Sequence, residues 1–113
     1  MKEEQPNLYE GMYILNPHLN EDGRQKVLSK LQEDITEKAG QIHKIHDYGR
    51  RRLAYEIDRH REGYYYIVYF SLLPSLVSGL WAEYRLNADL LRFLTLRTDK
   101  VSEEIKFKQL PEQ

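Results

Sequence analysis

Apolar positions along this chain follow two different spacings, and their order predicts an alternation of strands and helices. Segments rich in aromatic and branched side chains, or alternating between apolar and polar residues, are typical of strands. They occupy residues 8–15, 41–57, 64–71 and 90–98. Within the second of them, Ile42 and Ile45 lie three positions apart, so a regular strand would point them to opposite faces. We therefore expect a bulge or a twist there.

Two further segments place apolar residues at helical spacing. In the first, Asn20 is a suitable N-cap, acidic residues follow in the first turn, and Gly40 is a natural stop. Pro74 opens the second helix, where its missing N–H costs nothing, and residues 86–87 end it. The predicted buried stripes are Val27, Leu28, Leu31 and Ile35 in the first helix and Leu76, Val77, Leu80, Trp81 and Tyr84 in the second.

The order of these elements is βαββαβ, which predicts an α+β fold of the ferredoxin-like type. Its four-stranded antiparallel sheet carries both helices on one face, and no element remains to cover the other. The second and third strands form a long hairpin with a charged turn at 58–63. Residues 8–98 form the single domain, with a flexible N-terminal arm at 1–7 and a flexible C-terminal tail at 99–113. The tail carries the isolated apolar residues Val101, Ile105, Phe107 and Leu110.

Composition narrows the class of protein. Hydrophobic residues make up 41% of the chain and charged residues 31%, which is ordinary for a folded domain. The absence of cysteine excludes disulfides and thiol nucleophiles, and it fits a reducing, cytoplasmic location. The start of the chain lacks the pattern of a secretory signal. Residues 64–82 are uncharged, but Pro74 divides them into a strand-like and a helical half, so we expect no membrane partner.

Catalytic and metal-binding patterns are missing from the sequence. His43 and His46 are three apart on a predicted strand and would diverge, so no metal site is expected. No serine lies in a nucleophile-elbow pattern, and the six glycines are scattered rather than gathered in a phosphate loop. The sequence therefore predicts no enzyme, no cofactor and no small-molecule substrate.

One constellation points to binding. Five arginines fall within residues 49–62, directly before the aromatic run GYYYIVYF at 63–70. Arginines neutralise phosphates, and tyrosine rings stack on bases or pack against ribose. Alternate residues of a strand face opposite ways, so one set of these aromatics belongs to a core and the other remains available for contact. The arginine run could equally be a solvated sheet edge.

The aromatic run also resembles the third-strand signature of the RNA recognition motif. Glycine and the aromatics are in register, although Glu62 stands where a basic residue belongs and Tyr65 where glycine or alanine belongs. This resemblance implies a stand-alone module that binds single-stranded RNA through Tyr13, Tyr64 and Tyr66. A ferredoxin-like domain that pairs with proteins through its sheet, without RNA, is the third class considered.

A second resemblance covers residues 8–98. The chain carries YEGMYILNP, GRRRLAYEI, REGYYYIVYF and LLRFLTLR in that order, and so resembles bacterial small-subunit ribosomal protein six. The residues that match its hairpin signature are Gly49, Arg51, Leu53, Ala54, Tyr55 and Ile57. The resemblance implies the same fold and a structural role in the small ribosomal subunit, binding central-domain 16S ribosomal RNA jointly with ribosomal protein eighteen. The candidate RNA- or partner-binding residues are Arg50, Arg51, Arg52, Tyr64, Arg92 and Arg97.

Overall fold

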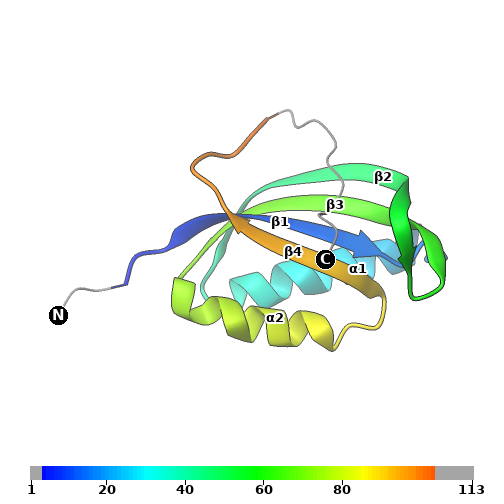
Figure 1. Ribbon diagram of the computed structural model, residues 1–113. Helices are drawn as coiled ribbons and strands as arrows, with labels where there is room; N and C mark the ends of the chain where they lie inside the picture. Colours follow the sequence, from blue (N-terminus) through cyan, green and yellow to red (C-terminus); the bar gives the residue numbers. More distant parts are fainter. Residues whose placement is uncertain (1–3, 104–113) are drawn as a thin grey trace.

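The protein adopts the predicted βαββαβ fold in the computed structural model, which describes residues 4–103. Its sheet has the order β2-β3-β1-β4 with every neighbouring pair antiparallel, and both helices lie on one face of it (Figure 1). The elements are β1 (Asn7–Leu15), α1 (Glu21–Thr36), β2 (Gln41–Ile57), β3 (His60–Leu72), a 3₁₀ turn (Pro74–Leu76), α2 (Val77–Arg85) and β4 (Leu90–Arg97).

Helix α1 begins as expected but ends differently. The Asn20 side chain accepts a hydrogen bond from the Gly23 amide at 2.7 Å, which caps the first turn. The helix ends at Thr36, and Ala39, with φ of 61°, takes the left-handed turn that Gly40 was expected to take. Gly40 is needed for another reason: a Cβ there would lie 2.9 Å from the Ser71 carbonyl oxygen.

The main core lies between the helices and the sheet. From β3 it takes Tyr66, Val68 and Phe70. The alternate residues Tyr65, Ile67 and Tyr69 are buried as well, on the other sheet face, so the expectation that one set of the run remains available for contact is wrong. At its centre the Tyr13 and Tyr84 hydroxyls are 2.7 Å apart, with rings in an edge-to-face arrangement. The other members of this core include Leu15, Val27, Leu28, Leu31, Ile35, Leu72, Val77, Leu80 and Leu90, with Trp81 packed against it. The stripe predicted for the first helix is thus confirmed, and so is that of the second except that Leu76 and Trp81 are only partly buried and Leu76 lies in the 3₁₀ turn.

Strand β2 contains the expected irregularity. Its pairing with β3 shifts between Ile42 and Lys44 and again between Asp47 and Gly49, which has φ of 71°. Because the first shift inserts one residue, Ile42 and Ile45 both pack on the helix-side core in spite of their odd spacing.

The β2–β3 hairpin closes more tightly than expected. Ile57 pairs with His60, so only Asp58 and Arg59 form the turn, with φ of 48° and 68°. Two positive φ values define a type I′ turn, which follows the twist of its strands. The expected turn over 58–63 is therefore wrong, because strand β3 already begins at His60. Strand β1 stops opposite Tyr64, so the end of the hairpin extends beyond the rest of the sheet (Figure 1).

The second sheet face is not bare, contrary to expectation. A second apolar cluster lies there, consisting of Met12, Ile14, Leu53, Tyr65, Ile67 and Tyr69, and Val101 packs against it. The segment after β4 is tied to β2, because His46 Nε2 bonds the Ser102 carbonyl oxygen at 2.9 Å and Lys44 pairs with Glu103 at 3.1 Å. The expectations for residues 1–3 and 104–113 lie outside the described residues. Within residues 4–103, no helix is long and apolar enough to cross a membrane.

Candidate nucleic-acid interface

The extended end of the β2–β3 hairpin gathers the densest positive charge of the described chain. We refer to residues 49–62 as the basic hairpin. All five of its arginines are exposed: Arg50, Arg51, Arg52, Arg59 and Arg61. Pairing with β3 positions Arg50, Arg51 and Arg52, and Ile57 pairs with His60 at the turn, but the register shifts between Arg52 and Ile57, so the end of the hairpin is irregular.

Two of the predicted arginines have local structural roles. Arg50 donates from Nη2 to the Pro17 carbonyl oxygen at 2.7 Å and from Nη1 to Glu62 Oε2 at 3.4 Å. It therefore ties the basic hairpin to the turn between β1 and α1. Arg51 donates from Nε to the Tyr48 carbonyl oxygen at 3.1 Å. Both guanidinium groups remain exposed, so both still contribute positive charge at the surface.

The other three arginines have uncompensated charge. Within residues 4–103, Arg52, Arg59 and Arg61 form neither a hydrogen bond nor an ion pair through their side chains. An exposed guanidinium offers five N–H donors in a planar fork, which matches the oxygens of phosphate. This end of the molecule therefore suits a polyanion.

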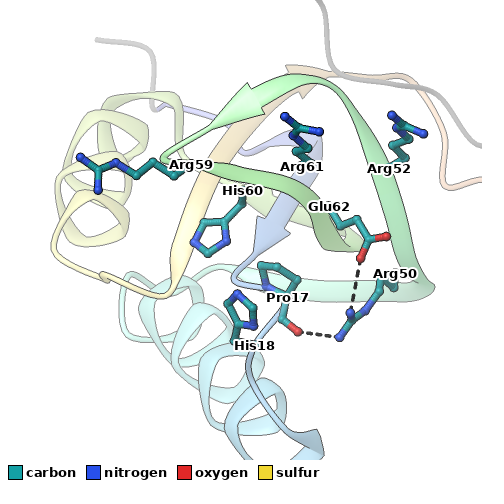
Figure 2. A pocket seen from close by; sticks show the side chains of 8 residues that line it. All are labelled: Pro17, His18, Arg50, Arg52, Arg59, His60, Arg61 and Glu62. Atoms are coloured by element: carbon teal, nitrogen blue, oxygen red, sulfur yellow. Dashed lines mark hydrogen bonds and ion pairs between the residues drawn. The ribbon is translucent and has the colours of Figure 1, made fainter.

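These arginines surround a hollow of about 330 Å³ between the basic hairpin and the β1–α1 turn (Figure 2). Its lining residues are Pro17, His18, Arg50, Arg52, Arg59, His60, Arg61 and Glu62. Four of these lining residues were not among the candidates predicted from the sequence: His18, His60, Arg59 and Arg61. The pairing rules of a tight hairpin could have placed the last three near the arginine run, but no local signal brings His18 from another loop to it.

Tyr64, which was expected to contact RNA or a partner, lies on the helix side of the sheet and packs against the core there. The Arg24 guanidinium covers its ring at 4.1 Å, and its hydroxyl donates to Asp47 Oδ2 at 3.4 Å. Tyr13 and Tyr66, the other rings of the single-strand-binding alternative, are 0% and 2% exposed. Rings enclosed in this way cannot stack on bases, so the structure counters that alternative.

The two arginines of β4 are separated by the structure. Arg92 donates a hydrogen bond to the Tyr55 hydroxyl and lies beside the second apolar cluster. Arg97 pairs with Tyr9, at the end of the sheet opposite to the basic hairpin. Leu15 lies six positions further along β1, which corresponds to roughly 20 Å. Arg97 is therefore not part of the hairpin surface.

The sheet face opposite the helices has a different chemistry. Burial raises the pKa of the Tyr65 and Tyr69 hydroxyls, so both stay neutral at physiological pH. Tyr69 donates to Glu10 Oε2 at 2.9 Å, and Leu96 at the rim is 47% exposed. No group of three potential metal ligands occurs within residues 4–103. This face is thus apolar at its centre and partly open at its edge.

Fold and site together define a ferredoxin-like α+β domain with an arginine-rich hairpin at one end of its sheet. Residues 8–97 match the family model described as Ribosomal protein S6. Small ribosomal subunit protein bS6 of Protochlamydia amoebophila is 58% identical over 113 residues, covering 100% of this chain and 99% of that protein. The same protein of Chlamydia abortus is 53% identical over 112 residues, covering 99% of this chain and 100% of that protein.

A solved structure gives the same result. The crystal structure of 30S ribosomal protein S6 from Thermotoga maritima superposes with a TM-score of 0.78 at 30% identity, covering 83% of this chain and 89% of that chain. The chain belongs to the ribosomal protein S6 family. It is accordingly a protein of the small ribosomal subunit, with a structural and not an enzymatic role.

Proposed function

We propose that this chain binds central-domain 16S ribosomal RNA jointly with ribosomal protein eighteen. The observation that carries the proposal is the set of three exposed arginines, Arg52, Arg59 and Arg61, which lack an acidic partner within residues 4–103. They lie on a hairpin whose end extends past the rest of the sheet (Figure 1). Contacts of this type read phosphate positions and RNA shape more than base sequence.

Joint binding is supported by how charge is distributed. The whole chain has a formal net charge of −1, so the field of the basic hairpin is local. The other surface of interest, the apolar sheet face with its exposed rim at Leu96, offers packing rather than charge. An apolar rim of this kind suits a protein partner, and a basic partner would supply the phosphate contacts that one hairpin cannot.

The test is a titration against a central-domain ribosomal RNA fragment, with and without ribosomal protein eighteen. We expect tight binding only when the partner is present, and weak binding to a short single-stranded RNA. Tight binding to the single strand by this chain alone would refute the proposal.

A variant that lacks two of these positive charges tests the role of the hairpin in the same titration. Arg52→Gln with Arg61→Gln should weaken RNA binding and reduce the dependence of log K on log salt by about 0.7–0.9 for each phosphate that is no longer neutralised. Arg50 is unsuitable here, because its removal also frees the Pro17 carbonyl and Glu62. The matched control is Lys26→Gln with Lys38→Gln, an equal charge change on the helical side, which should leave the salt dependence unaltered.

A further inference from the structure

The hollow under the basic hairpin has walls from two separate parts of the chain. Strands β2 and β3 supply the arginines and His60, and the β1–α1 turn supplies Pro17 and His18 (Figure 2). The bond from Arg50 to the Pro17 carbonyl oxygen, at 2.7 Å, holds these two walls together. The hollow therefore lies between two elements of the fold that the Arg50 side chain joins.

Its charge is strongly positive. Four arginines against one glutamate leave a net charge of +3 while the histidines are neutral. Glu62, the only acid of the lining, pairs with Arg50 at 3.4 Å. The charges of Arg52, Arg59 and Arg61 consequently have no counter-charge among the lining residues, and an anion in the hollow would supply it.

Two imidazoles complete the lining. The rings of His18 and His60 lie 5.3 Å apart at an angle of 56°. Within residues 4–103, neither ring makes a hydrogen bond, in contrast to His43 and His46 on β2, which bond Ser71 and Ser102. Imidazole carries an N–H donor even when neutral, so each ring has a donor to offer an anion.

We propose that this hollow binds the RNA backbone, with one phosphate held by imidazole N–H groups of His18 and His60 and a neighbouring phosphate neutralised by Arg52 and Arg61 on the outer side of the hairpin. The inference rests on the proposed function and assigns it one specific contact. It adds two histidines that the arginine run alone does not identify. A phosphodiester presents two unesterified oxygens and one negative charge, which suits the two imidazole donors that meet from the two walls within a positive field.

RNA is favoured over an acidic segment of a protein by the extent of the array. Arg51, between Arg50 and Arg52 on β2, is exposed but does not line the hollow, so the positive charge continues beyond it. A single carboxylate would neutralise one of the unpaired arginines. Successive phosphates of one RNA strand would engage the hollow and its flanking arginines together.

The first experiment uses the free protein and inorganic phosphate. The imidazole NMR signals of all four histidines are followed as phosphate replaces chloride at constant ionic strength and pH. We expect saturable shifts for His18 and His60 only, weakened in Arg61→Gln, with His43 and His46 as internal controls. Equal, non-saturating shifts of all four histidines would show that the hollow is not a phosphate-binding site.

The second experiment measures the RNA affinity of the joint complex with ribosomal protein eighteen. His18→Ala with His60→Ala should reduce affinity for the central-domain fragment about tenfold or more, since two hydrogen bonds to a charged group are removed. His43→Ala is the control, and thermal melts verify folding. If the double variant keeps the affinity of the parent protein, the histidines do not hold an RNA phosphate, and the proposed function is unaffected.

Two further outcomes separate the inferences. If the double variant instead weakens binding of ribosomal protein eighteen in the absence of RNA, the hollow holds a carboxylate of the partner, and the phosphate assignment is wrong. If the histidines respond to phosphate but the complex does not bind the central domain, the proposed function fails and the phosphate-binding site stands.

Discussion

Removing one hydroxyl from the tyrosine pair in the core should destabilise the domain more than removing both. Tyr13 and Tyr84 are 0% and 1% exposed, and their hydroxyls share one 2.7 Å hydrogen bond. Tyr84→Phe leaves the Tyr13 hydroxyl buried without that partner, at a cost of about 1–3 kcal/mol. Tyr13→Phe has the equivalent effect. Replacing both by phenylalanine removes the polar groups together and keeps the ring packing, so the double variant should lose less stability than either single variant.

Urea unfolding of the four proteins, followed by tryptophan fluorescence and far-UV circular dichroism, yields this double-mutant cycle. In thermal melts the melting temperature of each single variant should fall by roughly 4–8 °C for each kcal/mol of destabilisation. Additive losses, with the double variant the least stable of the four, would refute the reasoning. They would show that each hydroxyl contributes through separate interactions instead of through their shared bond.

Three further predictions concern stability. Arg59→Gly should raise the free energy of unfolding by about 0.5–1 kcal/mol, because glycine takes φ of 68° without strain. The control Arg61→Gly, at a residue without positive φ, should lower the free energy of unfolding. A lowered melting temperature for Arg59→Gly would contradict the prediction. Leu53→Ala should cost about 2–5 kcal/mol and more than Tyr55→Ala, since Leu53 is 8% exposed and Tyr55 is half-buried; equal melting temperatures would contradict it. Burial raises the pKa of both core tyrosines, Tyr13 and Tyr84, so above pH 10 the unfolded state binds fewer protons than the folded state. The free energy of unfolding should therefore fall as the pH rises. Denaturation midpoints that are flat from pH 9 to 11 would contradict this prediction.

The fold could be predicted because its signals are local. Each element has its own spacing, cap or breaker: Asn20 caps α1 as expected, whereas Pro74 opens the 3₁₀ turn that precedes α2 instead of α2 itself. The bulge of β2 could also be predicted, because the odd interval from Ile42 to Ile45 is incompatible with a regular strand. The hairpin turn was harder, since Asp58 and Arg59 adopt positive φ without glycine and give no sequence signal for a two-residue turn.

The site could be predicted only in part. The arginine run is visible as composition, and the structure exposes it as expected. Which tyrosines of the aromatic run face the helices depends on pairing with β1, however, and that register places Tyr64 beneath Arg24. His18 reaches the hairpin only through the path of the β1–α1 turn. Proximity of this kind is a tertiary property that no single segment encodes.

The segment after β4 shows the same limit. Its polar composition predicts a loose tail, yet Ser102 and Glu103 bond to β2 across the sheet face. The bonds depend on His46 and Lys44, which lie more than fifty residues earlier in the chain. Sequence patterns of the tail alone could not identify these partners.

The position of β1 has a consequence for how the protein is made. It is the first strand to be synthesised, but it lies in the interior of the sheet between β3 and β4. A growing chain that has not yet passed Leu90 therefore presents β1 with one edge unpaired. Such an edge, on a strand whose side chains are mostly apolar, can pair with strands of other chains. Translation that stalls inside α2 should therefore release fragments prone to aggregation, because the second edge of β1 is covered only when β4 has been made.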